Sequence, residues 1–229
     1  MPTLPDQPAS APPRCVLITG GTGYLGRALI PALLARGHRV RALVRPGSEK
    51  KLPEGVESVV GDPLVAADVL RGLAGSDTLV HLVGVPKPSP AKARQFRAID
   101  LVSIQASVIA AVKTQPRPHL VYLSVGQPAP VMKAYVSVRQ AGEALIASAG
   151  LDATCLRPWY VLGPGHRWPI LLLPVYALLK LFPATREGVE RLGFVTLGQM
   201  LAALVQAVEQ PAQGIRIMDV PAIKRSPVR

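Results

Sequence analysis

Three glycines near the start of the chain have the spacing that a nucleotide diphosphate requires of its binding loop. Gly20, Gly23 and Gly26 form a GxxGxxG pattern. The apolar run Cys15–Thr19 precedes them, and the helix-forming segment Tyr24–Arg36 follows at once. Glycine lets the backbone turn tightly and approach phosphate oxygens, while the amides and the positive end of the new helix attract the anion. A plain glycine-rich turn would share the composition, but this strand-to-helix context favours dinucleotide binding.

The elements that must position this loop alternate regularly along the chain. Strands are expected at Cys15–Thr19, Arg39–Val44, Ser58–Val60, Thr78–Val83, Leu120–Ser124, Ala153–Leu156 and Gly214–Val220. Helices are expected at Tyr24–Arg36, Pro63–Leu73, Ala91–Lys113, Val131–Ala149 and Val195–Glu209. This alternation predicts an α/β fold of the Rossmann type, a doubly wound parallel sheet with right-handed crossovers.

Length and composition agree with one such domain. The chain has 229 residues, of which 49% are hydrophobic and only 4% aromatic, so the core must consist of Val, Leu, Ile and Ala. Parallel strands buried on both faces have this composition. We expect one domain over residues 14–221, with a small C-terminal lobe from about residue 158. The five prolines of residues 1–13 indicate a disordered lead-in, and residues 222–229 form a basic tail.

The net charge of +12 admits three kinds of partner: nucleic acid, an anionic membrane surface or a phosphorylated ligand. No aromatic residues interleave with the basic ones and no DNA-binding motif is present, so nucleic acid is disfavoured. Much of the charge can also simply solubilise the protein. Cys15 and Cys155 lie in apolar strands, which indicates free buried thiols, a reducing compartment and a cytoplasmic protein. The scattered histidines offer no metal-ligand spacing.

The segment Trp168–Phe182 is nearly all apolar but contains Pro169 and Pro174. It is shorter than the roughly 20 residues that span a bilayer. We expect a helical cover over a substrate cleft. A shallow peripheral membrane contact or an apolar substrate pocket remain the alternatives, and Lys180 with the excess positive charge keeps the membrane association open.

Residues at the ends of the second and third strands bear on the nucleotide. An acidic residue after the second strand would bind both ribose hydroxyls of NAD, but Arg45 stands there. Its guanidinium can pair with a 2′-phosphate, so NADP is favoured over NAD, unless Arg45 is only a solvated loop residue. Asp62 can accept a hydrogen bond from adenine, cap the helix starting at Pro63, or do both. The small residues around Val83 and Gly84 would let ribose and phosphates pass close to the backbone.

The order of motifs TGGTGYLGR, ALVR, GD, HLVGV, LSVG, YxxxR and LRPWYVLGPG resembles the short-chain dehydrogenase/reductase superfamily. It is most similar to the atypical NAD(P)-binding branch that includes NmrA-like regulators and the Rossmann-type accessory subunit of respiratory complex I, and to epimerase-like members. The resemblance covers roughly residues 14–209. It implies a seven-stranded sheet with a small substrate lobe, and a homodimer through helices 91–113 and 131–149 is an option. The cofactor contacts it implies are Gly20, Thr22, Gly23, Tyr24, Leu25, Gly26, Arg45, Asp62, Leu64, Val83, Gly84, Pro158, Tyr160 and Val161.

The same resemblance implies three catalytic positions. Active members use a Ser or Thr with a Tyr-x-x-x-Lys pair, whose spacing places both side chains on one helix face. The corresponding residues here are Ser124, Tyr135 and Arg139. The arginine keeps the charge and could hold a ribose hydroxyl, but it cannot share in a proton relay. Tyr135 and Arg139 would otherwise be merely one face of a helix.

Two functions follow from these residues. In the first, the protein is an NADP-dependent oxidoreductase of a small or lipophilic, quinone-like carbonyl compound. Ser124 would polarise the carbonyl, and Tyr135 would act as acid and base beside Arg139. In the second, it binds NADP as a redox sensor or as a structural subunit of an assembly, without rapid turnover. Fold alone does not separate binding from chemistry.

Overall fold

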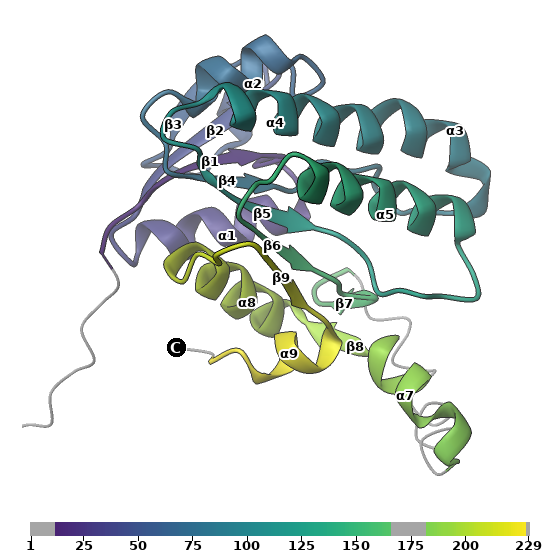
Figure 1. Ribbon diagram of the computed structural model, residues 1–229. Coiled ribbons are helices and arrows are strands. Elements are labelled where there is room, and N and C mark those ends of the chain that lie inside the picture. The colour runs from purple at the N-terminus through teal and green to yellow at the C-terminus, as the bar shows by residue number, and fades with distance from the viewer. Residues whose placement is uncertain (1–11, 166–181, 228–229) are drawn as a thin grey trace, which may run out of the picture.

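Seven parallel strands form the central sheet, in the order β3-β2-β1-β4-β5-β6-β9 (Figure 1). The computed structural model describes residues 12–165 and 182–227. The strands are β1 (Cys15–Thr19), β2 (Arg39–Val44), β3 (Glu57–Val60), β4 (Thr78–His81), β5 (His119–Leu123), β6 (Ala153–Leu156) and β9 (Ile215–Met218). The strand order reverses between β1 and β4, which confirms the predicted doubly wound α/β fold. Folds of this kind have their ligand crevice at the carboxyl ends of the strands, at such a reversal.

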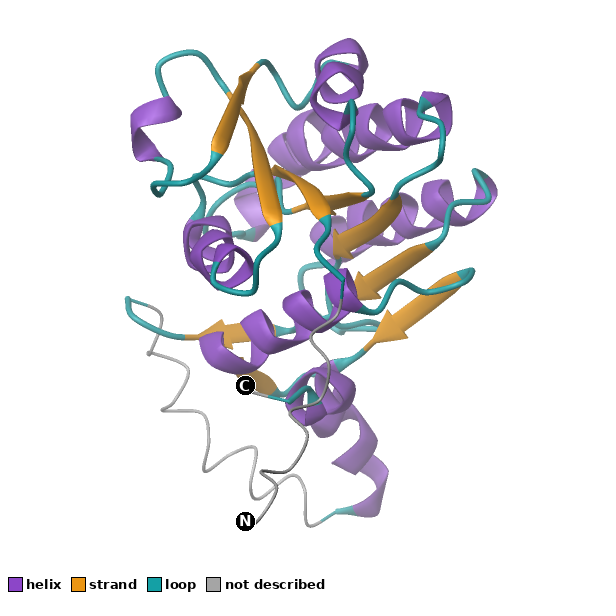
Figure 2. Ribbon diagram, turned by 90° about the vertical axis from the view of Figure 1, so that its left-hand side faces the viewer, coloured by secondary structure: helices purple, strands orange, loops and turns teal. Residues whose placement is uncertain are grey.

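Helices cover both faces of this sheet (Figures 1 and 2). One face carries α2 (Ala66–Leu73), α4 (Val102–Lys113) and α5 (Lys133–Ser148), and the other carries α1 (Tyr24–Leu34) and α8 (Leu197–Glu209). Each layer has its own apolar core. Ile18, Leu29 and Leu204 belong to the α1–α8 side, while Leu17, Leu73 and Ile104 belong to the other, and all six are fully buried.

The predicted helix 91–113 is a continuous helical run of changing geometry. A 3-10 turn (Pro90–Lys92), α3 (Ala93–Gln95) and a π-helical segment (Phe96–Leu101) lead into α4. By length and composition alone, Pro90–Lys113 could cross a membrane, but half of its most apolar stretch is buried inside the protein. Its packing on α2 and α5 identifies it as a core helix of the domain.

Several predicted boundaries are wrong by a few residues. Helix α1 ends at Leu34, because Gly37 at φ +80° turns the chain toward β2. Helix α2 begins at Ala66 instead of Pro63. Strand β4 ends at His81, so Val83 has left the sheet. A left-handed Met132 at φ 58° precedes α5, which therefore begins at Lys133.

The C-terminal lobe contains elements that the sequence did not predict. Two short strands, β7 (Tyr160–Leu162) and β8 (Phe194–Thr196), pair in parallel beside the main sheet. Helix α7 (Pro183–Arg191) precedes β8, and α9 (Val220–Arg225) follows β9. Residues 222–225 are thus helical, where a basic tail was expected. Of the predicted apolar cover Trp168–Phe182, residues 168–181 lie outside the described residues, as do residues 1–11 of the predicted lead-in.

Candidate functional site

The glycine loop between β1 and α1 is folded too tightly for side chains at two positions. Gly20 has φ +80°, and a Cβ there would lie 2.8 Å from the Leu82 carbonyl carbon. A Cβ on Gly26 would lie 2.5 Å from the Gly20 carbonyl oxygen and 2.6 Å from the Gly21 Cα. The close approach of Gly20 to Leu82 lets the loop pack against the chain beyond β4. The close approach of Gly26 to Gly20 lets α1 start directly against the loop. The glycine spacing is therefore a steric requirement of this turn.

The start of α1 offers backbone rather than side-chain chemistry. Gly23 is the N-cap residue, donates its own amide to the Gly20 carbonyl at 3.0 Å, and provides no side-chain cap. Thr22, Tyr24 and Leu25 flank it, so the first turn of the helix points its dipole at the crevice with no carboxylate beside it. An anionic diphosphate is the ligand that such a helix start attracts.

A buried histidine joins β1 to β4 beneath this loop. His81 Nδ1 lies 3.1 Å from Thr19 Oγ1 and 3.0 Å from Ser107 Oγ, and its Nε2 lies 3.3 Å from Ser103 Oγ. Burial lowers the pKa of His81 to about 3, with the charge of Arg139 acting in the same direction. The ring is therefore neutral at physiological pH and acts as a hydrogen-bonded support at the point where the strand order reverses.

The adenosine side of the edge carries an exposed cation and a constrained carboxylate. Arg45 follows β2, is exposed, and takes part in none of the ion pairs between described residues. Asp62 follows β3 and accepts the Leu64 amide at 2.9 Å, which forms a local turn. The N-cap of α2 is Val65, so the predicted capping role of Asp62 is wrong.

Arg139 is not free at the edge but buried in an ion pair. Its guanidinium is 2.7 Å from Asp100 Oδ1 and donates to the Leu123 carbonyl at 2.9 Å. A longer contact of 3.4 Å reaches the Val83 carbonyl, and Arg139 is only 2% exposed. The guanidinium also fills the space beside Gly84, where any side chain would collide with it. Arg139 thus ties the chain after β4 to the chain after β5.

Asp100 completes this tie from the π-helical segment. Its second oxygen accepts the Val85 amide at 3.0 Å, and the side chain is fully buried. Burial raises the pKa of Asp100, while Arg139 opposes that shift. Tyr135 lies on the same cluster, with Arg139 5.2 Å from its ring centroid and the Phe96 ring 5.0 Å away. The Tyr135 ring is therefore held between a cation and an apolar ring.

Ser124 follows β5 and directs its hydroxyl away from the predicted role. Its Oγ donates to Glu143 Oε1 at 2.5 Å, and the same carboxylate accepts Gln127 Nε2 and Arg157 Nε, each at 2.9 Å. A hydroxyl whose proton is given to a carboxylate presents only lone pairs to a ligand. As arranged here, Ser124 can accept a hydrogen bond but does not polarise a carbonyl.

The residues after β6 close the far side of the edge. Pro158 accepts the Gly126 amide at 2.9 Å, and Tyr160 and Val161 form β7. Tyr24 of the glycine loop reaches this segment, since a side chain at Gly163 would collide with its hydroxyl. Burial and the neighbouring Tyr160 raise the pKa of Tyr24. The predicted nicotinamide-side residues and the glycine loop therefore lie close together.

Asp100 and Glu143 are the site residues that the sequence interpretation missed. Tyr135, Arg139 and Glu143 are spaced by four, so one face of α5 carries all three, and this spacing was a usable signal. Asp100 offered a weaker one, because it is the sole acidic residue between Thr78 and Gly142. Its partner is 39 residues away in the chain, and only the fold brings them together.

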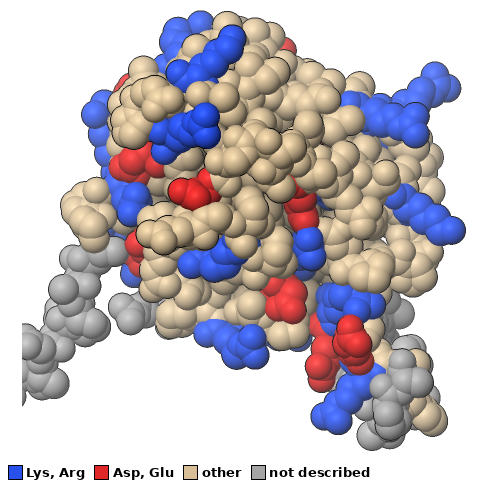
Figure 3. Space-filling view, in the orientation of Figure 1, with Lys and Arg blue, Asp and Glu red and all other residues tan. Residues whose placement is uncertain are grey.

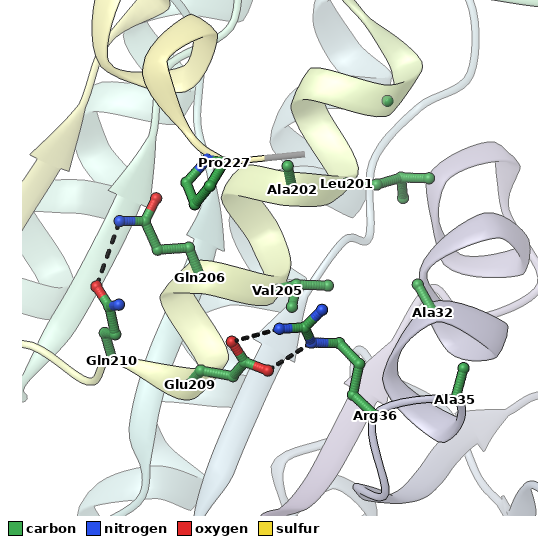
Figure 4. Close-up of a pocket in the computed structure, with 11 residues that line it drawn as sticks. Ala32, Ala35, Arg36, Leu201, Ala202, Val205, Gln206, Glu209, Gln210 and Pro227 are labelled. Carbon is green, nitrogen blue, oxygen red and sulfur yellow. Dashed lines mark hydrogen bonds and ion pairs between the residues drawn. The ribbon is translucent and has the colours of Figure 1, made fainter. Parts of the chain in front are cut away.

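One groove of the structure does not belong to this site. A groove of about 490 Å³ lies between α1 and α8, where Arg36 and Glu209 form an ion pair (Figure 4). None of the residues lining this groove is a predicted site residue. Within residues 12–165 and 182–227, no group of three or more His, Cys, Asp or Glu residues could hold a metal ion.

The predicted cofactor residues all follow the carboxyl ends of the parallel strands or begin the next element, and the glycine loop is shaped for a diphosphate. The comparisons with known proteins agree. The family model described as NAD(P)H-binding matches residues 20–166, more than half of the chain. The enzyme WbmH of Bordetella bronchiseptica, solved in complex with NAD+, superposes with a TM-score of 0.67 at 22% identity, over 90% of this chain and 76% of that one. This likeness shows the shared fold.

Two curated relatives are named for reductions. A ceramide reductase of Caulobacter vibrioides is 29% identical over 208 residues, which cover 90% of this chain and 64% of that protein. A 3-diazoavenalumate denitrifying reductase of Streptomyces is 28% identical over 227 residues, which cover 87% of this chain and 73% of that protein. The chain thus spans less than two thirds of the length of the ceramide reductase.

Proposed function

Because the chain belongs to the NAD(P)H-binding family of Rossmann-fold proteins, we propose that it is an NADP-dependent oxidoreductase acting on a lipophilic carbonyl compound. The observation that carries this proposal is that the glycine loop contacts the chain after β4, and that Arg139, which packs on the Tyr135 ring, bonds to the same stretch of chain. The reductase names of the relatives support the reaction type, and the ceramide reductase supports a lipophilic substrate.

The catalytic roles of Tyr135, Ser124 and Arg139 would differ from those expected from the sequence. A bound NAD(P)H would supply the hydride. Tyr135 is the remaining group that can give a proton to the developing alkoxide oxygen, because the Ser124 proton is held by Glu143. Arg139 would position Tyr135 through its ring face and keep the Val83 and Leu123 carbonyls in place, but its own proton stays on the guanidinium.

Turnover is tested by NADPH oxidation with quinones, aldehydes and long-chain ketones. We expect Tyr135→Phe to lower kcat by about 100-fold or more, as for loss of a general acid. Tyr122→Phe is the matched control, because Tyr122 is fully buried in the core and its side chain is closed to a substrate. Equal rates for the wild type and Tyr135→Phe, or no oxidation by either while NADPH binds, would contradict an oxidoreductase function.

Cofactor choice is tested separately by calorimetric titration with NADPH and NADH. Arg45 is an exposed cation at the end of β2, and we expect it to pair with a 2′-phosphate. Arg45→Ala should then weaken NADPH binding by about 10-fold to 100-fold and leave NADH binding unchanged. Identical affinities for both nucleotides in both proteins would contradict the NADP preference.

A second candidate function is supported by the two hydrogen-bonded pairs. Arg139 is paired with Asp100, and Ser124 with Glu143, so two of the three predicted catalytic side chains are already engaged within the protein. A protein that binds NADP as a redox sensor or an assembly subunit would have such an edge. Tight NADPH binding without turnover of any tested compound would favour this function.

A further inference from the structure

A group of cations surrounds the edge that holds Tyr135. We define the cationic rim as Lys87, Lys92, Arg94, Arg97 and Lys133. Lys92 is partly buried and donates to the Pro86 and Lys87 carbonyls, whereas the other four are exposed. None of the five takes part in an ion pair with a described carboxylate. The rim therefore carries uncompensated positive charge.

The fold gathers the rim from two segments. The 3-10 turn Pro90–Lys92 and the π-helical segment Phe96–Leu101 both pack against α5, whose first residue is Lys133. From Thr78 to Gly142 the single acidic residue is Asp100, which is fully buried and neutralised by Arg139. Figure 3 shows Lys and Arg side chains, and no Asp or Glu, along the right-hand side where Figure 1 places the starts of α3 and α5.

An exposed apolar side chain beside the rim indicates which kind of partner the rim binds. Val131 is 55% exposed and lies two residues before Lys133. Nucleic acid binding would call for exposed aromatic rings, but Phe96 is fully buried and Tyr135 is packed between Phe96 and Arg139. Cations flanked by an exposed aliphatic side chain suit the headgroup region of an anionic bilayer.

We propose that the cationic rim docks the protein onto an anionic lipid surface. The edge carrying Tyr135, Val83 and Gly84 then faces the membrane, since the rim borders it. The rim shares no residue with the apolar segment 168–182, which the sequence analysis named as a membrane contact. The proposal does not depend on catalysis, so a failure of the oxidoreductase function would leave its test intact.

The test is flotation of the full chain with vesicles of phosphatidylcholine alone or mixed with phosphatidylserine. The wild type should float with the anionic vesicles, remain unbound with the neutral ones, and be released by high salt. Because each cation near an anionic surface contributes about fivefold to binding, Arg94→Glu/Arg97→Glu should lower the partition coefficient by about 25-fold or more. The matched control is Lys113→Glu/Arg117→Glu, which changes net charge equally at two exposed positions near the opposite end of α4.

The control variant should lose no more than about threefold, since its charges lie far from the surface that we expect to touch lipid. Circular dichroism should show that both variants are folded, because all four substituted side chains are exposed. Absence of wild-type flotation, or an equal loss in both variants, would overturn the proposal. So would binding of duplex DNA that depends on Arg94 and Arg97 without any binding to vesicles, because the rim would then be a nucleic acid surface.

Discussion

The two halves of the cofactor edge are built on different principles. In the nucleotide half, residues 15–73, the binding loop is shaped by the absence of side chains, and Arg45, the cation expected at the nucleotide, is exposed. In the hydride half, residues 78–157, the edge is shaped by charges paired within the protein: Arg139 is buried on Asp100, and the partly buried Glu143 pairs with Ser124 and Arg157. The first half leaves groups available to a ligand, whereas the second satisfies most of them internally.

This difference separates binding from chemistry within one fold. A helix start without a side-chain cap leaves its first amides available to an anion, so the nucleotide half is prepared for binding. A buried ion pair is already satisfied, and its removal leaves one charge without a partner. The hydride half is therefore prepared mainly for rigidity, and Tyr135 is its remaining predicted catalytic group that is only partly buried.

The largest expected effect comes from breaking the ion pair of the hydride half. Asp100→Ala and Arg139→Met should each lower the free energy of unfolding by about 3–5 kcal/mol, because each leaves a buried charge unpaired. The double variant should lose clearly less than the sum of the two. Arg71→Met is the matched control, since Arg71 is 57% exposed in its pair with Asp68, and it should lose about 1 kcal/mol or less. Urea unfolding measures all four.

A negligible loss in Arg139→Met, together with a large loss of NADPH affinity, would contradict this comparison. Arg139 would then be a ligand-binding side chain, as the sequence alone suggested, and the hydride half would be built like the nucleotide half.

The next effect tests the nucleotide half. Gly26→Ala places a methyl group 2.5 Å from the Gly20 carbonyl oxygen, so the loop must move. We expect dinucleotide affinity to fall by about 100-fold and stability by about 1–3 kcal/mol. Gly198→Ala is the matched control in the first turn of α8, where the nearest atom is 3.9 Å away. It should bind normally and gain up to about 1 kcal/mol. Unchanged nucleotide affinity in Gly26→Ala, measured by calorimetry, would contradict a diphosphate site at this loop.

The sequence predicted the nucleotide half more completely than the hydride half, for a physical reason. Strands β1 and β2 of this half were predicted to the residue, because short apolar runs between turn residues have few alternatives. Gly26 meets Gly20 and Gly21, so its role can be inferred from local spacing, whereas the approach of Gly20 to Leu82 appears only in the fold. The doubly wound parallel sheet was likewise predicted by the alternation of elements, and its seven strands were implied by the family resemblance.

The missed features depend on contacts between distant segments. Asp100 meets Arg139 across 39 residues, and β7 meets β8 across more than thirty, so no local pattern contains them. Strand β4 was predicted too long because Val83 is apolar enough for a strand. The Val83 carbonyl instead accepts a hydrogen bond from Arg139, and the Val85 amide donates one to Asp100. An arginine four residues after a tyrosine can be seen in a sequence, but the carboxylate that pairs with it cannot.

The smallest expected effect tests whether water is excluded from the two buried histidines of the hydride half, His81 and His119. Burial lowers the pKa of His81 to about 3 and that of His119 to about 4, whereas an unfolded histidine titrates near 6.5. Between these values the unfolded chain binds protons that the folded chain does not, so the free energy of unfolding falls as pH falls below about 6.5. From about pH 7.5 to about pH 5.5, each histidine should lower the free energy of unfolding by about 1.3 kcal/mol.

His119→Gln isolates one of these two contributions. Between the same two pH values, the free energy of unfolding of the variant should fall by about 1.3 kcal/mol less than that of the wild type, because glutamine does not titrate. Comparing the two pH values within each protein cancels the packing loss that the substitution itself causes. His81 remains in this variant, bonded to Thr19 on one side and to Ser103 and Ser107 on the other, so the two halves stay joined. Equal decreases in the wild type and His119→Gln would mean that His119 titrates normally, and that water reaches its ring at the start of β5, where the structure buries it.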